Sequence, residues 1–177
     1  MFKVPHRHFV MSIASELWPY LRQDRSLWKV YMDSAIDTLN DYLPKIMQRD
    51  VTIGAIVILH PFGKDMMFHP HLHLIITEGG FGPDKSWMHQ FYFKAEGFAS
   101  CWKYHVCRNL HHAGIPFSVT NWCYQHKRFY VWVHRDGTIN NPKNIARYLG
   151  RYVRHPAIAN SRIDFFNKKT MRVGFHY

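Results

Sequence analysis

Runs of apolar and β-branched side chains, interrupted by Gly, Pro and charged residues, predict the strands of this chain. Residues 51–60 are almost wholly apolar, which is typical of a buried strand, and residues 68–77 alternate between polar and apolar positions before a glycine-rich break. Similar but shorter patterns predict further strands at residues 7–13, 87–93, 128–134, 161–166 and 170–177.

Apolar residues at a spacing of three and four predict the helices. Residues 24–43 form an amphipathic pattern that we expect Pro44 to end or kink, and residues 94–112 form a second one. A third helix is predicted over residues 141–154, with Pro142 at its first position and Pro156 beyond its end. We expect Ser15 to cap a short turn that ends near Pro19. The order of elements predicts one α+β domain over residues 1–177, with helices packed on an antiparallel sheet.

Alternating histidines stand out on the strand predicted over 68–77. Side chains two residues apart share a face of a strand, so His71 and His73 lie side by side while Leu72 and Leu74 enter the core. Imidazoles are common ligands of divalent metals, and two of them on a rigid strand form half of a metal site. One histidine alone would usually be structural, but this grouping favours a metal site.

A third ligand is expected from the neighbouring strand or loop. His60 closes the preceding strand, and folding back at the loop 61–67 would place it beside the pair. Asp65 in that loop is the alternative, because an oxygen ligand suits Mg²⁺ or Mn²⁺ well. His69 shares the face but lies nearer the loop, so we place it outside the ligand set.

Three enzyme families carry such histidines, and the cluster alone does not choose among them. Histidine-triad nucleotide hydrolases have three alternating histidines, cupins have two followed by a glutamate, and HUH single-strand endonucleases have two around a hydrophobic residue. The predicted helices argue against a cupin, which would be nearly all strand. About a hundred residues follow the cluster, which argues against a histidine triad near the end of its catalytic core.

Two tyrosines on the helix predicted over 141–154 favour the third family. Tyr148 and Tyr152 are four residues apart, so they lie one above the other on one face. They fall between an apolar stripe and a cationic stripe, where a ring can be held by packing while arginines bind phosphate oxygens. In isolation such tyrosines would be ordinary border residues, but beside a metal half-site we interpret them as nucleophiles. The stripes comprise Ile145, Leu149 and Val153 on one side and Arg147, Arg151 and Arg154 on the other.

Charge is distributed unevenly along the 177 residues. Residues 1–88 hold 9 basic and 9 acidic side chains, whereas residues 89–177 hold 14 and 3, which accounts for the net charge of +11. A basic half of this kind favours a polyanionic partner, most often nucleic acid. The side chains that we expect to contact DNA are Lys143, Arg147, Arg151, Arg154 and Arg162.

Cysteines and hydropathy set the expected compartment. Three cysteines without a CxxC pair do not suggest a disulfide framework, and no apolar run is long enough to span a membrane. We expect a cytoplasmic, nucleoid-associated protein of a prokaryotic-type cell that has no membrane partner. The oligomeric state is open.

A family resemblance connects these motifs. The sequence His71-Leu72-His73, followed later by Tyr148-Leu149-Gly150-Arg151-Tyr152, resembles the two-tyrosine HUH transposases of rolling-circle insertion sequences. The likeness extends to the first strand around residues 6–10, to the flanks 59–63 and 78–80 of the histidine strand, and to residues 152–163 after the tyrosine helix. It therefore covers nearly the whole chain.

The resemblance implies a fold and a reaction. It implies an HUH endonuclease domain that uses Mg²⁺ or Mn²⁺ to cleave and rejoin single-stranded DNA, at transposon ends and at the target, in rolling-circle transposition and recombination. It also implies that Tyr148 or Tyr152 attacks the phosphate and forms a 5′-phosphotyrosine intermediate with a free 3′-hydroxyl. Two rival functions are a histidine-triad nucleotide hydrolase and a non-catalytic module that binds single-stranded nucleic acid.

The chain also departs from that family. Members usually carry a cysteine-rich zinc-binding segment before the first strand, and they usually continue past a strand like the one at residues 172–177. We therefore expect the chain to correspond to the catalytic core.

Overall fold

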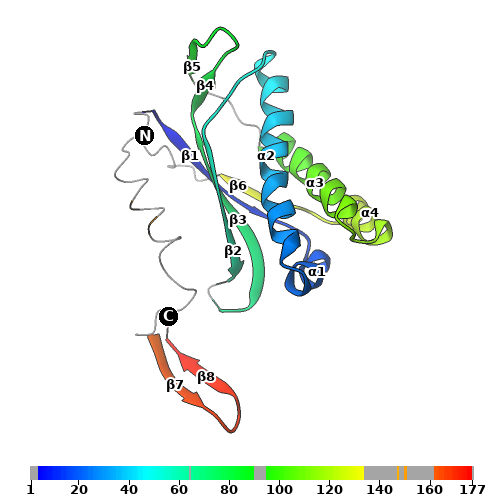
Figure 1. The fold of residues 1–177 in the computed structure, drawn as a ribbon, viewed down its shortest axis with the longest axis vertical. Helices are drawn as coiled ribbons and strands as arrows, with labels where there is room; N and C mark the ends of the chain where they lie inside the picture. The colour runs from blue at the N-terminus through cyan, green and yellow to red at the C-terminus, as the bar shows by residue number, and fades with distance from the viewer. Residues whose placement is uncertain are drawn as a thin grey trace.

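A computed structural model describes residues 4–63, 65–89, 95–133, 147, 150 and 162–176. Strands and helices alternate through the first part of the chain, and two short strands follow near its end (Figure 1). The elements are β1 (His6–Ser12), η1 (Ser15–Leu17), α1 (Trp18–Gln23), α2 (Ser26–Met47), β2 (Ala55–Phe62), β3 (Phe68–Thr77), β4 (Gly79–Phe81), β5 (Trp87–His89), α3 (Ala95–His112), α4 (Phe117–His126), β6 (Val131–Val133), β7 (Ile163–Asn167) and β8 (Arg172–Phe175).

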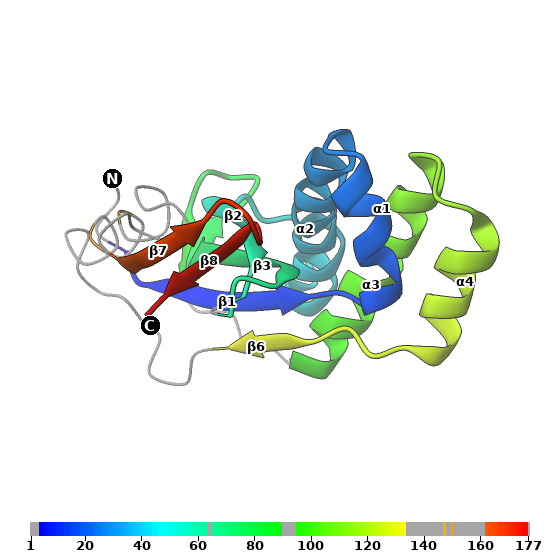
Figure 2. The ribbon, with the colours of Figure 1, turned by 90° about the horizontal axis from the view of Figure 1, so that it is seen from below.

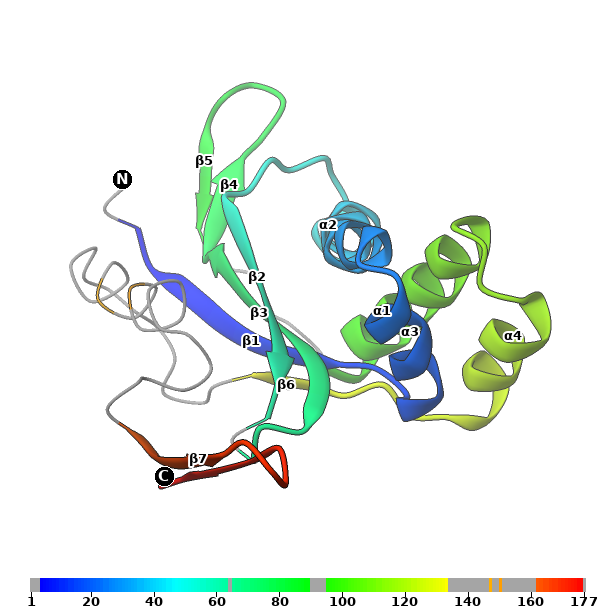
Figure 3. The same ribbon diagram turned by 60° about the horizontal axis from the view of Figure 1, so that its bottom comes forward.

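The central sheet has the strand order β2-β3-β1-β6, and every pairing in it is antiparallel. β3 lies between β2 and β1, so its side chains meet neighbours from both (Figure 3). The predicted bounds of this strand, 68–77, are those observed. The predicted α+β class, with helices packed on an antiparallel sheet, is confirmed.

Helices α2 and α3 cover one face of the sheet (Figures 1 and 2). The hydrophobic core lies between that face and the two helices. Alternate residues of the central strands point into this core, and Phe9, Met11, Leu72 and Leu74 are fully buried there. Burial of each such side chain stabilises the fold by roughly 1.5–3 kcal/mol relative to exposure. Because strand side chains alternate, the residues between these point to the opposite face.

Two aromatic side chains tie the helices to the two inner strands of that sheet, β1 and β3. The indole Nε1 of Trp102 on α3 donates to the carbonyl of Ser12, 3.1 Å away. The hydroxyl of Tyr31 on α2 donates to the carbonyl of Pro70 at 3.4 Å, and burial raises the pKa of this phenol. Both acceptors are neighbours of His71: Pro70 directly precedes it on β3, and Ser12 of β1 is its partner across the strands. The helices therefore hold the backbone beside the histidines.

The structure corrects three local expectations. Pro44 lies inside α2, and the helix continues to Met47 because Leu43 is buried and Ile46 and Met47 pack against the core. Its end is instead marked by Gln48 in the left-handed conformation, with φ of 54°.

The second correction concerns Ser15, which is the first residue of η1 rather than its cap; the N-cap is Ala14, which makes no side-chain cap hydrogen bond. The short turn itself ends at Leu17, near Pro19 as predicted, and Pro19 stands in the first turn of α1, where its missing N–H breaks no helical bond. The third is α4, which the apolar pattern did not predict because only two of its residues are buried, Thr120 and Cys123.

Two short hairpins lie outside the central sheet. β4 pairs with β5, and β7 pairs with β8. The β7–β8 hairpin exposes several large apolar side chains, among them Phe165 and Phe166. Among the described residues, no helix combines the length and the apolar character needed to cross a membrane. Most of the helix predicted over 141–154 lies outside the described residues; Arg147 and Gly150 are helical.

Candidate metal centre

Three histidines converge on the face of the sheet opposite the helices. His60 of β2 is the direct cross-strand partner of His71 of β3, and His73 follows two residues along. One ring nitrogen of each of the three lies within 4.8 Å of the others. The ring centroids of His60 and His73 are 4.3 Å apart, and those of His71 and His73 are 5.2 Å apart. The structure thus brings together the three residues that the sequence predicts as ligands.

The backbone fixes the orientation and the tautomer of His71. Its Nδ1 lies 2.8 Å from the carbonyl oxygen of His69, which can only accept, so Nδ1 carries the proton and donates. The lone pair of His71 then sits on Nε2. Metal-binding histidines typically donate their other ring N–H in this way, which holds the ring in place.

A fourth histidine supports His73. The Nε2 atom of His8 on β1 lies 2.9 Å from Nδ1 of His73, and the two ring planes are 5° apart. His8 is 4% exposed and His73 6% exposed, so the pair is sheltered from water. If His73 donates from Nδ1, its Nε2 presents a lone pair to the site, and His8 takes the role of an orienting acceptor.

Burial keeps these rings neutral. The pKa of His73 is lowered to about 3, first by burial and then by repulsion from the neighbouring imidazoles of His60, His8 and His71. Burial likewise lowers the pKa of His71, although its hydrogen bond to the carbonyl of His69 opposes the shift. Neutral imidazole is the form that binds a metal. The donor set and its protonation therefore fit a divalent cation.

Arg7 and Glu78 form an ion pair at the other end of the strands that carry His8 and His73. The guanidinium Nε of Arg7 lies 2.6 Å from Oε1 of Glu78, whose side chain is 8% exposed. Arg7 neighbours His8 on β1, and Glu78 directly follows β3. The pair joins the two strands that carry His8 and His73, and Glu78 has a structural partner.

The remaining predicted residues fall into four groups. Asp65 accepts a hydrogen bond from the backbone N–H of Met67 and does not join the histidine cluster. His69 is exposed and contributes its carbonyl oxygen rather than its ring, which contacts Trp18 at a centroid distance of 4.8 Å. The helical Arg147 is exposed, as is Arg162 just before β7. Tyr148, Tyr152, Lys143, Arg151 and Arg154 lie outside the described residues.

Sequence reasoning did not identify His8 as part of the cluster. The only local signal was the alternation of His6 and His8 on the first strand, which places both on one face. Its contact with His73 depends on the position of β1 beside β3, which local pattern does not reveal.

Known proteins resemble this chain over most of its length. The transposase for insertion sequence element IS801 from Pseudomonas savastanoi pv. phaseolicola is 28% identical over 185 residues, which cover 95% of this chain and 44% of that relative. The chain therefore spans less than half the length of this relative.

Two solved structures share a distant likeness with the fold. The conjugative relaxase TrwC in complex with oriT DNA has a TM-score of 0.46 and 12% identity, covering 63% of this chain and 45% of the relaxase chain. A REP-associated tyrosine transposase bound to a REP hairpin has a TM-score of 0.39 and 16% identity, covering 89% of this chain and 72% of the other.

A protein-family model matches a much longer part of this chain than the short histidine and tyrosine motifs. The match runs over residues 54–177 and so includes β2, β3, the histidine cluster and the tyrosine motif. The model is Y2_Tnp, which is described as "Putative transposase". This agrees with the transposase resemblance of the sequence motifs, and the chain belongs to the Y2_Tnp transposase family.

Proposed function

We propose that residues 1–177 form one catalytic domain that cleaves and rejoins single-stranded DNA with a bound divalent metal, Mg²⁺ or Mn²⁺, through a 5′-phosphotyrosine intermediate. The observation that carries the proposal is the convergence of His60, His71 and His73 on one sheet face in a chain of a transposase family.

The three histidines would hold the metal, which supplies polarisation of the scissile phosphate and stabilisation of the charge that develops on it. The carbonyl of His69 and the ring of His8 orient two of these imidazoles. The imidazoles sit on the paired strands β2 and β3, so their arrangement would be set before DNA binds. Trp102 of α3 ties the neighbouring strand β1 to the helices. Such preorganisation lowers the cost of reaching the reactive geometry.

Tyr148 or Tyr152 is proposed as the nucleophile. The phenol oxygen bonds to phosphorus, the 3′-oxygen of the preceding nucleotide leaves, and a 5′-phosphotyrosine remains. The phosphodiester energy is kept in that bond, so attack by a free 3′-hydroxyl can rejoin strands. Two tyrosines one helical turn apart would allow two strands to be held in turn.

The β7–β8 hairpin is proposed as part of the single-strand binding surface. Phe165 is 58% and Phe166 51% exposed, and the turn between the strands carries the exposed Lys168 and Lys169. Exposed aromatic rings next to basic side chains are the usual means of gripping a single strand, by stacking on bases and pairing with phosphates. The partly described basic set Lys143, Arg147, Arg151, Arg154 and Arg162 would extend this surface.

The test is cleavage of end-labelled single-stranded oligonucleotide pools in Mn²⁺, in Mg²⁺ and in EDTA. We expect cleavage only with metal, and an affinity for DNA that falls steeply with salt because binding releases counterions. His71→Ala is expected to abolish cleavage, whereas His112→Ala, an exposed histidine at the end of α3, serves as the matched control and keeps it. Cleavage that persists in EDTA and in His71→Ala would refute the proposal.

A further inference from the structure

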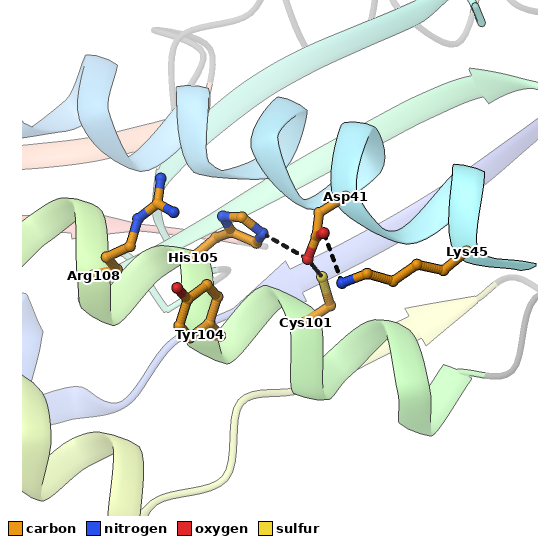
Figure 4. A pocket seen from close by; sticks show the side chains of 6 residues that line it. All are labelled: Asp41, Lys45, Cys101, Tyr104, His105 and Arg108. Carbon is orange, nitrogen blue, oxygen red and sulfur yellow. Dashed lines mark hydrogen bonds and ion pairs between the residues drawn. The ribbon is translucent and has the colours of Figure 1, made fainter. Parts of the chain in front are cut away.

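We propose that Asp41, Cys101 and His105 form a second metal site, suited to Zn²⁺, that joins α2 to α3. Asp41 lies on α2, and Cys101 and His105 lie one turn apart on α3. One ligand atom from each of the three lies within 4.8 Å of the others. The cluster lies between α2 and α3 in the helical layer (Figure 4), whereas the histidine centre is built on β2 and β3 of the sheet.

The distances suit a small tetrahedral ion. The carboxylate Oδ2 of Asp41 lies 3.3 Å from Sγ of Cys101 and 3.2 Å from Nε2 of His105. Around a tetrahedral Zn²⁺ with its usual bond lengths, neighbouring ligand atoms are separated by roughly 3.3–3.7 Å. The side chains therefore need only small movements to bind an ion.

The choice of ligands also favours zinc. Cys101 offers a thiol, which as thiolate binds Zn²⁺ strongly and Mg²⁺ or Ca²⁺ poorly. Its spacing from His105, i and i+4 on a helix, places both donors on one face. Among the described residues Nδ1 of His105 has no hydrogen-bond partner, so the polar contact of this buried ring is made at Nε2, toward the cluster.

A hydrogen bond links Cys101 to Asp41 in the cluster. Burial raises the pKa of Cys101 to about 12, with the carboxylate of Asp41 adding to the shift, so the thiol is protonated and donates to Asp41. Coordination would replace the S–H bond by an S–metal bond and release one proton to solvent. The ion then takes the place of that proton between sulfur and carboxylate.

Lys45 leaves the metal-facing oxygen accessible. Its Nζ pairs with Oδ1 of Asp41 at 2.6 Å, while Cys101 and His105 contact Oδ2. Figure 4 shows Lys45 reaching Asp41 from the right, His105 from the left and Cys101 from below. The cluster opens into a hollow that Tyr104 and Arg108 also line, where water can fill a fourth position.

A seam of ordinary hydrogen bonds between α2 and α3 is the competing explanation. Farther along the same helices, the amide Nδ2 of Asn109 donates to Oδ2 of Asp37 at 2.7 Å and to Ser34 at 3.1 Å. Those contacts contain no thiol and no imidazole. The Asp41 cluster differs from them in offering carboxylate, sulfur and nitrogen atoms at one point.

The experiment is titration of the metal-stripped full chain with Co²⁺, a spectroscopic substitute for Zn²⁺. A thiolate ligand produces sulfur-to-cobalt charge-transfer absorption in the near ultraviolet, which a site of histidines alone does not. We expect this absorption in the wild type and its loss in Cys101→Ser, with circular dichroism confirming that the variant is folded. Cys107→Ser, another cysteine of α3, is the matched control and should keep the absorption.

Zinc content distinguishes this site from the histidine centre. After zinc loading and removal of free metal, we expect about two ions per wild-type chain and about one in either Cys101→Ser or His71→Ala. If His71→Ala kept both ions while Cys101→Ser lost one, the histidine centre of the proposed function would be contradicted and the second site supported. A wild type without charge-transfer absorption, or a Cys101→Ser variant with undiminished absorption, would overturn the second site.

Discussion

The histidine centre and the Asp41 cluster are built on different supports. The first uses imidazoles on paired β-strands, with His60 directly opposite His71. The second joins side chains of two helices, and its carboxylate already has a lysine partner. In the first the rings stay neutral because burial lowers the pKa of His73 to about 3. In the second the carboxylate stays ionised because the Lys45 ion pair comes first in lowering the pKa of Asp41 to about 2.

The two proposed sites would therefore have different roles. The histidine centre would take part in the reaction, and the Asp41 cluster would hold α2 and α3 together. An all-nitrogen set on rigid strands, in a chain whose second half is basic, suits a metal that acts on phosphate. A thiol, a carboxylate and an imidazole between two helices suit a metal that holds those helices together. Changes at the sheet should therefore alter cleavage, and changes at the helices should alter stability.

The largest effect is expected from His60→Ala. Removing one of three ligands should weaken metal binding and lower the cleavage rate by about 10²–10³-fold, comparable to the loss of one strong electrostatic stabiliser. Cleavage rates at saturating metal, together with a metal titration, would measure it. Asp65→Ala is the matched control, because the hydrogen bond that Asp65 makes among the described residues is with the backbone N–H of Met67. A larger loss in Asp65→Ala than in His60→Ala would show that the third ligand is wrongly assigned.

A smaller effect is expected from His8→Phe. The variant keeps an aromatic ring but removes the partner of Nδ1 of His73, so metal affinity should fall by about 10–100-fold. Isothermal titration with Mn²⁺ would measure the change. His8→Gln restores a hydrogen-bonding group and should recover part of the affinity. Equal affinities in His8→Phe and wild type would mean that His8 does not orient His73.

Acidification should destabilise the metal-free protein. The pKa values of His6, His71 and His73 are lowered in the fold, with burial as the first cause. The unfolded chain therefore binds more protons below pH 6.5, and stability is lost as pH falls from about 6.5 toward 4, by up to about 1.4 kcal/mol per pH unit for each such group. Urea unfolding across this range would measure the slope. A His73→Leu variant with an unchanged slope would contradict this assignment.

The smallest effect is expected from Lys45→Met. Nζ of Lys45 is largely exposed, and its pairing with Asp41 is an i,i+4 contact, so solvent screens it. The free energy of unfolding of the metal-free protein should therefore fall only slightly. Lys29→Met removes the similar exposed pair with Asp33 and provides the control. If Lys45→Met lowered the free energy of unfolding several times more than Lys29→Met, the pair of Lys45 with Asp41 would be a main contribution to the stability of the helix packing.

Local pattern predicted the histidine strand well because its alternation is strict. Leu72 and Leu74 enter the core and His71 and His73 take the other face, so the period of two is visible in the sequence alone. The position of His60 followed from the short loop between two strands, since a tight reversal places their ends together. These inferences needed no knowledge of the rest of the fold.

Contacts between distant elements were beyond such reasoning. The pairing of His8 with His73 spans 65 residues and depends on the order of strands in the sheet. Asp41 lies on the polar side of its helix pattern, and only the docking of α2 against α3 brings it to Cys101. Pro44 shows the same limit, because packing of the residues around it carries the helix through a position that local propensity disfavours.

The central claim is tested most directly by trapping a covalent protein–DNA adduct. Single-stranded DNA is incubated with the protein and Mn²⁺, the mixture is denatured, and the cross-linked residue is identified by mass spectrometry. The account predicts a metal-dependent adduct on Tyr148 or Tyr152, which is lost in EDTA and in the double variant Tyr148→Phe, Tyr152→Phe. DNA binding without any adduct would indicate a non-catalytic module, and nucleotide hydrolysis that the double variant retains would indicate a histidine-triad hydrolase; either result would contradict it.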